Sequence, residues 1–225
     1  MAIFVCTYCD HKFTNETYYN KHYCETHKRH DYLKTSRGIS TFTYYKEWLR
    51  LSKGNVAVDE TTFIGSKYFT SFMKFVEFSH KMMIPSVPSF IKFAVSKHIL
   101  PTKWCSDTVF VDYISNLDNN YLPMEQAEET VKTVYELAGI FDCKPNQIFN
   151  HLEAGDCIKL LKARKLTPWV LLFSKTFHQY LSVNLSKEQR IQIQTSIDPN
   201  IWKYKFQSRP EDVKMMKKMV NSLGL

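Results

Sequence analysis

Apolar residues recur at helical spacing along most of the chain, and the sequence lacks the sustained apolar/polar alternation that is typical of strands. Phe69, Phe72, Phe75 and Val76, for example, lie three and four positions apart, which places them on one face of a helix. No Asn-Gly or Asp-Gly dipeptide marks a tight hairpin turn. The pattern therefore predicts a mainly α protein in which residues 63–225 form an all-α multi-helix domain.

Capping and helix-breaking residues divide this region into separate helices. Ser106 is expected to cap one helix, Ser186 with Gln189 forms a capping-box pattern, and Gly139 is expected just after a helix end. The expected helices cover residues 41–52, 69–83, 90–99, 107–117, 124–138, 146–152, 156–165, 169–181, 200–206 and 210–223.

Cysteine and histidine residues stand at a regular spacing near the N-terminus. Two residues separate Cys6 from Cys9, twelve more precede His22, and four more precede His27. Two cysteines on a tight turn and two histidines about one helical turn apart supply the four sulfur and nitrogen ligands of a tetrahedral Zn²⁺. We therefore expect these four residues to hold a structural zinc ion.

Apolar residues around these ligands also follow a known arrangement. Phe4, Phe13 and Tyr19 occupy the core positions of the two-Cys, two-His zinc finger family, and residues 4–27 resemble that family. The resemblance implies a small ββα unit whose folding depends on Zn²⁺. It extends over 24 of the 225 residues and says nothing about the others.

Two neighbouring residues are alternative zinc ligands. Cys24 follows His22 by two positions, so on a continuous helix its side chain would point away from the ligand face, and we do not expect it to bind. His30 follows His27 by three positions and could take the place of His27.

The expected organisation has three parts. Residues 1–30 form the zinc finger, residues 31–62 form a connector with one helix, and residues 63–225 form the all-α domain. The connector helix carries Tyr44, Tyr45 and Trp48 in an apolar stripe that would dock on the following domain.

The chain is basic, and its charge is unevenly distributed. The formal net charge is +8; residues 112–158 carry 2 basic and 9 acidic side chains, and residues 159–225 carry 13 basic and 4 acidic ones. This balance favours an anionic partner, of which nucleic acid is the commonest. The alternative is that the acidic and basic regions only attract each other.

The expected nucleic-acid contacts fall into two sets. In DNA-reading members of the family, positions −1, 3 and 6 of the finger helix contact bases, position 2 lies beside them, and a single finger reads only about 3 base pairs. At these positions, and in the basic segment after them, stand Asn15, Thr17, Tyr18, Lys21, Lys28 and Arg29. The second set, expected to bind phosphates, comprises Lys159, Lys162, Arg164, Lys165, Lys203, Lys205 and Arg209.

These patterns predict a zinc-containing nucleic-acid-binding accessory protein for replication or transcription, with DNA favoured over RNA. The alternative is a protein adaptor that docks on a polymerase or helicase through the finger or through the exposed side of Tyr44, Tyr45 and Trp48. Phosphate-loop, dinucleotide, zinc-protease and serine-hydrolase motifs are absent from the sequence, so we expect no catalytic residues and no enzyme.

Hydropathy and composition bear on location and origin. The longest apolar-rich run, residues 63–84, is interrupted by charged residues, and no secretory signal opens the chain. We therefore expect an intracellular protein, in the cytoplasm or nucleus, without a membrane partner. Alanine is rare while Lys, Asn, Tyr and Phe are plentiful, as in the AT-rich genomes of many viruses and phages.

Overall fold

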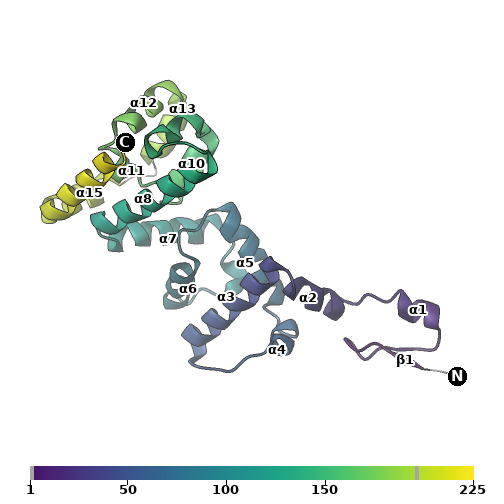
Figure 1. Cartoon of the computed structure of the whole chain (residues 1–225). Helices are drawn as coiled ribbons and strands as arrows, with labels where there is room; N and C mark the ends of the chain where they lie inside the picture. Colours follow the sequence, from purple (N-terminus) through teal and green to yellow (C-terminus); the bar gives the residue numbers. More distant parts are fainter. Residues whose placement is uncertain (1–2, 196–197) are drawn as a thin grey trace. The chain divides into compact units, whose positions relative to one another are not determined.

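The computed structural model describes residues 3–195 and 198–225, and this part of the chain is mainly α-helical (Figure 1). Its two strands, β1 (Phe4–Val5) and β2 (Lys12–Phe13), pair antiparallel with Phe4 opposite Phe13. The prediction of a mainly α protein with a small strand-containing N-terminal region is therefore confirmed. None of the helices in the described ranges is long and apolar enough to cross a membrane.

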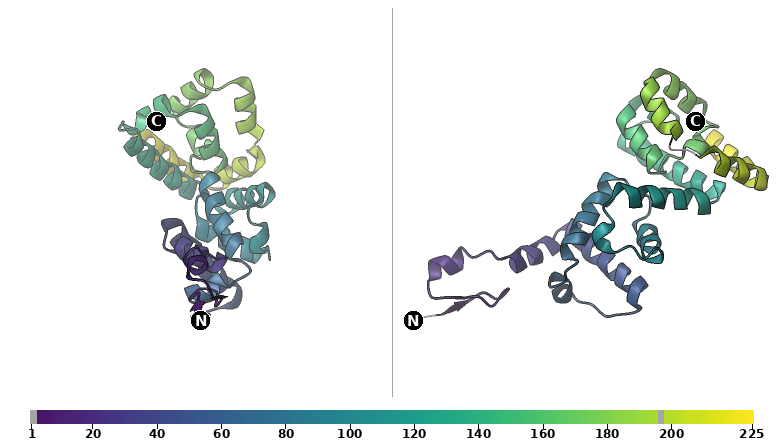
Figure 2. Two further views of the ribbon diagram at one scale, coloured as in Figure 1. Left: turned by 90° about the vertical axis from the view of Figure 1, so that its right-hand side faces the viewer. Right: turned by 180° about the vertical axis from the view of Figure 1, so that it is seen from behind.

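The chain divides into two compact units, which we call unit 1 (residues 1–81 and 86–109) and unit 2 (residues 82–85 and 110–225). The described helices of unit 1 are α1 (Glu16–Asn20), α2 (Glu25–Leu33), α3 (Ser36–Lys53), α4 (Glu60–Ile64), α5 (Phe69–Lys81), α6 (Val87–Ser96) and the 3-10 turn η1 (Pro101–Lys103). Figure 2 shows the strand pair and α1, in purple, at the N-terminal end of this unit.

Unit 2 contains most of α7 and all of the helices that follow it. These elements are α7 (Asp107–Asn120), α8 (Pro123–Ile140), η2 (Pro145–Gln147), α9 (Ile148–His151), α10 (Ala154–Lys162), α11 (Pro168–Leu171), α12 (Lys175–Val183), α13 (Lys187–Thr195), α14 (Pro199–Ser208) and α15 (Pro210–Ser222). Helices α8 and α15 pack side by side, and Val134 and Val220 on them are completely buried.

Aromatic side chains build the core of unit 1. Helix α3 packs against α5 and α6, and the ring of Tyr45 lies 4.4 Å from that of Phe63 and 5.4 Å from that of Phe72. Phe75 in turn meets Trp104 at 5.0 Å. Each such ring pair contributes about 0.5–1.5 kcal/mol beyond the area it buries.

The helix expected in a connector is therefore part of this core. Tyr45 and Trp48 are only 6% and 8% exposed, so α3 is a central element of unit 1. The boundary between the compact units accordingly falls near residue 110, whereas the sequence placed a domain boundary at residue 63.

Several local signals in the sequence act as expected. Val109 N donates to the Ser106 hydroxyl at 3.2 Å, and Ser186 and Gln189 exchange the two hydrogen bonds of a capping box. Gly139, however, lies inside α8, which continues to Ile140.

The expected helix over residues 169–181 is interrupted. Helix α11 ends at Leu171, and α12 begins after Ser174. The Ser174 hydroxyl accepts a hydrogen bond from Phe177 N at 3.0 Å and so starts a new helix instead of continuing the old one.

Candidate functional site

Four side chains near the N-terminus form a candidate metal centre. Cys6, Cys9, His22 and Cys24 each offer one ligand atom, and these atoms all lie within 4.8 Å of one another. Cys6 Sγ lies 4.0 Å from Cys24 Sγ, and Cys9 Sγ lies 3.3 Å from His22 Nε2. Tetrahedral coordination with metal–sulfur bonds of about 2.3 Å and metal–nitrogen bonds of about 2.0 Å separates ligand atoms by about 3.5–3.8 Å. The group therefore fits a metal ion of this geometry.

A tight turn after β1 positions the first two ligands. Cys6 N donates to His11 O at 2.9 Å, and Asp10 N donates to Cys6 O at 2.9 Å. The turn requires a left-handed residue, Asp10 with φ 57°, and aspartate is one of the few residue types that accept this conformation.

Backbone hydrogen bonds and mutual crowding act on the thiols of this turn. A hydrogen bond from the backbone of Tyr8 lowers the pKa of the Cys6 thiol, which favours the thiolate that binds metals. At Cys9, a backbone hydrogen bond from His11 lowers the pKa, but desolvation and the neighbouring thiols Cys6 and Cys24 outweigh it and raise the pKa overall. A cation would relieve this crowding of three thiols, because it replaces their protons.

The fourth member of the group is Cys24, not the expected His27. The prediction assumed one helix through both histidines, but α1 ends at Asn20 and α2 begins only at Glu25. Cys24 has an extended backbone, with φ −74° and ψ 167°. In an extended segment, successive side chains point to opposite sides, so residues two positions apart, such as His22 and Cys24, face the same side.

His27 and His30 lie on α2, outside the metal group. The His27 ring stacks on Tyr8 with 4.0 Å between centroids, and its Nε2 lies 3.4 Å from an Asp31 oxygen. His30 also contacts the Tyr8 ring, at 5.1 Å. The third cysteine, so close to the first two in sequence, was the signal that could have identified the fourth ligand.

The finger residues expected to face nucleic acid lie on and around α1. Asn15 is the N-cap of this helix, and its side-chain oxygen accepts hydrogen bonds from Thr17 N and Tyr18 N at 2.8 and 3.3 Å. Thr17, Tyr18 and Lys21 are exposed, and Tyr18 retains 69% of its accessible surface. The Asn15 oxygen is thus occupied locally, while the other three side chains face solvent.

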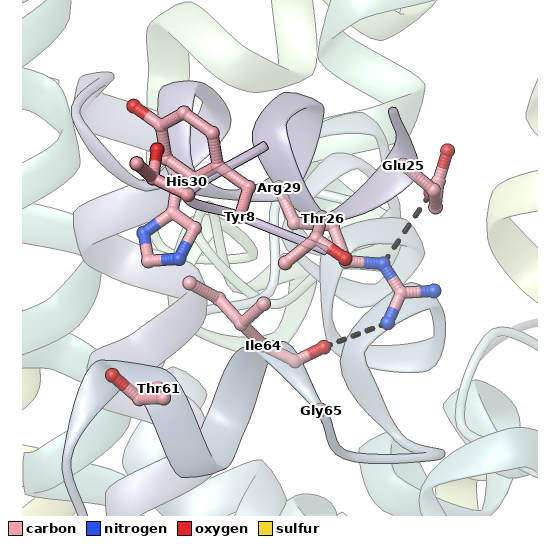
Figure 3. A pocket seen from close by; sticks show the side chains of 9 residues that line it. Tyr8, Glu25, Thr26, Arg29, His30, Thr61, Ile64 and Gly65 are labelled. Carbon is pink, nitrogen blue, oxygen red and sulfur yellow. Dashed lines mark hydrogen bonds and ion pairs between the residues drawn. The ribbon is translucent and has the colours of Figure 1, made fainter. Parts of the chain in front are cut away.

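Arg29 has a structural role instead of the expected phosphate contact. Its Nη1 donates to Ile64 O at 2.7 Å, its Nε donates to Glu25 at 3.3 Å, and its guanidinium lies 4.8 Å from the Phe69 ring. The hydrogen bonds to Ile64 and Glu25 are visible in Figure 3, beside a pocket of about 760 Å³ that Tyr8 and Arg29 help to line. Arg29 therefore attaches α2 to α4, whereas Lys28 is exposed.

Arg164 is buried, which corrects its expected place on a basic surface. Only 3% of its side chain is exposed, and it makes a bidentate ion pair with Asp118, with Nε and Nη2 at 2.8 and 2.6 Å from the carboxylate oxygens. Helix α10 ends at Lys162, and Arg164 takes a left-handed φ of 60°. The helical spacing assumed for residues 159–165 therefore fails at this residue.

Lys205 is also buried, with 9% of its surface exposed. Its Nζ donates to Tyr121 O and lies 5.2 Å from the Trp202 ring. Desolvation lowers the pKa of its ammonium group. Lys205 is three residues after the buried Trp202 and shares its helix face, so it is not the exposed phosphate contact that the sequence predicted.

Three more members of the second set lie within ion-pair distance of an acidic side chain, which offsets their charge. Lys159 lies 2.7 Å from Asp156, Lys165 lies 3.9 Å from Glu129, and Arg209 lies 3.8 Å from Asp212. Lys162 and Lys203 are exposed, and no ion pair involves them within the described ranges. The expected basic surface is therefore much reduced.

The aromatic stripe of the alternative adaptor hypothesis does not form a docking surface. Tyr45 and Trp48 are buried in the core of unit 1, and Tyr44 is half-buried with its ring 6.1 Å from that of Phe75. Comparisons with protein family models, with curated proteins and with solved structures find no match to this chain, so the evidence for its function comes from its own residues.

Proposed function

We propose that the protein is a zinc-containing nucleic-acid-binding accessory protein whose N-terminal segment contacts the nucleic acid. Zn²⁺ would be held by Cys6, Cys9, His22 and Cys24. The observation that carries the proposal is the convergence of these four ligand atoms to within 4.8 Å. Three thiolates and one imidazole are a donor set that structural zinc sites use.

Burial in the N-terminal segment supports a structural role for the ion. Across residues 3–24, Cys6 is the only buried residue. Apolar burial alone cannot hold so small a unit in one conformation, whereas zinc binding supplies an apparent free energy of about 10–16 kcal/mol in small zinc peptides. In this role the ion organises the two strands and α1, and it takes no part in a reaction.

Exposed side chains on α1 support contact with a single strand. A nucleobase can stack on the ring of Tyr18, and Lys21 can neutralise a phosphate close by. Helix α1 has five residues, too few to place readers along three base pairs of a major groove as a longer finger helix does. We therefore infer stacking and phosphate contact, with single-stranded DNA as the first ligand to test.

The test pairs a metal analysis with binding of a fluorescent single-stranded oligonucleotide to the full-length protein. Tyr18→Ala is expected to weaken binding about 5- to 150-fold, because base–aromatic stacking contributes about 1–3 kcal/mol per base. Lys21→Gln is expected to reduce the salt dependence of binding. Tyr135→Ala, which removes a ring that is 59% exposed in unit 2, is the matched control. Equal losses in Tyr18→Ala and Tyr135→Ala would exclude α1 as the contact site.

Exposed apolar residues beside the metal group favour a second candidate, an adaptor that docks on a protein such as a polymerase or helicase. Ile3 and Val5 are 62% and 42% exposed, which suits a protein interface better than a nucleic acid. Val5→Ser would then abolish partner capture and leave oligonucleotide binding unchanged. Lys21→Gln would have the opposite effect if the first candidate is correct.

A further inference from the structure

A second pocket, of about 520 Å³, lies in unit 2 where the end of α7 and the start of α8 approach the junction of α14 and α15. Lys205 and Arg209 are its two charged lining residues, and both are cations. The other polar side chains that line it are neutral, namely Asn119, Asn120, Tyr204 and Ser208. The lining therefore favours an anionic ligand.

The buried ammonium group of Lys205 has fewer partners than donors. It carries three N–H donors, and in the described ranges its hydrogen-bond acceptor is Tyr121 O. The charges of Asp118 and Glu125 act on this ammonium group, but within the described ranges their hydrogen bonds go elsewhere, to Arg164 and, at 2.6 Å, to Leu122 N. A buried charge without full partners is costly, so an anion in the pocket would satisfy the remaining donors.

Arg209 adds a second cation at the start of a helix. It is the N-cap of α15, a helix of 13 residues whose first turn carries the acidic residues Glu211 and Asp212, so the positive charge gained at this helix start is that of the Arg209 guanidinium itself. The Arg209 guanidinium lies 3.8 Å from Asp212, beyond hydrogen-bond distance, which leaves its donors available to a ligand. Lys205 and Arg209 thus offer two cationic groups to one anion.

The neutral residues suit the remainder of a nucleotide. Tyr204 is 72% exposed and presents a ring for stacking. The amide nitrogens of Asn119 and Asn120 donate to Ser115 O and Asn116 O at 2.8 Å each, which leaves their carbonyl oxygens as acceptors for sugar hydroxyl or base amino groups. The volume lies within the range of about 300–1,000 Å³ of small-molecule sites.

We propose that this pocket binds a nucleotide, with its phosphate on Lys205 and Arg209 and its base against Tyr204. The site consists of residues of unit 2 and uses neither the metal group nor α1. It goes beyond the proposed function of the N-terminal segment, and either proposal can fail without the other.

The test is calorimetric titration of the full-length protein with thymidine monophosphate, inorganic phosphate and thymidine. We expect saturable binding of the monophosphate, weaker binding of phosphate and the weakest binding of thymidine. Arg209→Gln is expected to weaken binding of the monophosphate and of phosphate about tenfold or more, because it removes a charge-assisted contact. Tyr204→Ala should weaken binding of the monophosphate alone, by about 5-fold or more. Lys203→Gln, an exposed cation on the same helix, is the matched control.

Two further experiments distinguish a free nucleotide from the end of a strand and test the role of Lys205. Tighter binding of 5′-phosphorylated than of unphosphorylated thymidine trinucleotide would identify the end of a strand, and equal binding would identify a free nucleotide. Lys205→Met should abolish phosphate binding. If this variant does not fold, Arg209→Gln still tests the phosphate site, because the Arg209 side chain is 49% exposed. The absence of saturable binding in the millimolar range, or equal losses in Lys203→Gln and Arg209→Gln, would overturn the proposal.

Discussion

The N-terminal segment and unit 2 are stabilised by different physical means. Residues 3–24 have one buried side chain and four convergent metal ligands, whereas unit 2 has fully buried residues on most of its helices, including Val134, Leu161 and Val220. In the first region, a few directional bonds to the proposed ion would hold the chain in one conformation. In the second, many side chains share the burial, so no single contact decides whether the fold exists.

The largest expected effect comes from removing the ion. Chelation by EDTA, or Cys24→Ser, should unfold residues 3–24 and leave the helices of unit 2 intact, because unit 2 contains none of the ligands. Loss of a ligand should reduce metal affinity at least about a hundredfold, since even an outer-shell partner is worth 10–100-fold. Residue-resolved amide exchange, with metal content measured in parallel, tests both statements.

Two matched variants make this test specific. Cys143→Ser removes a thiol outside the metal group, and His27→Gln removes the histidine that the sequence favoured as a ligand. Both should keep stoichiometric metal. Loss of metal in His27→Gln together with retention in Cys24→Ser would contradict the ligand set proposed here.

Removing the partner of a buried charge is the converse experiment, because it should destabilise unit 2 and leave the metal group intact. Asp118→Asn leaves Arg164 buried without its counter-ion, and breaking such a pair costs about 3–5 kcal/mol. Asp156→Asn, which removes an exposed pair with Lys159, should cost at most about 1 kcal/mol. Urea unfolding followed by tryptophan fluorescence measures the difference. Similar midpoints for the two variants would contradict the structural role of Arg164.

How well the sequence predicts a contact depends on how far apart its two partners lie in the chain. Helix starts at Ser106 and Ser186 could be predicted because each depends on residues three positions apart. Arg164 and Lys205 could not, since their partners Asp118 and Tyr121 are 46 and 84 positions away in the sequence. Local spacing alone made both residues look like parts of an exposed basic face.

The ligands of the metal group were also predictable only where their spacing in the sequence was sufficient. Cys6, Cys9 and His22 converge as their spacing indicated. The fourth ligand depended on whether one helix continues through residues 22–24, and α1 ends before them. No proline or glycine marks that helix end in the sequence, so the sequence favoured His27 as the fourth ligand where the structure has Cys24.

The smallest expected effects come from removing one helix cap in each region. Asn15→Ala removes the cap of α1, and Ser174→Ala removes the cap of α12; each loss costs about 0.5–2 kcal/mol. If the proposed ion holds the N-terminal segment, Asn15→Ala should appear as a roughly 2- to 30-fold loss of metal affinity with an unchanged urea midpoint. Ser174→Ala should lower the urea midpoint and leave metal affinity unchanged. If both variants shifted the urea midpoint equally, folding of the N-terminal segment would be coupled to that of unit 2, and the contrast between the two regions would fail.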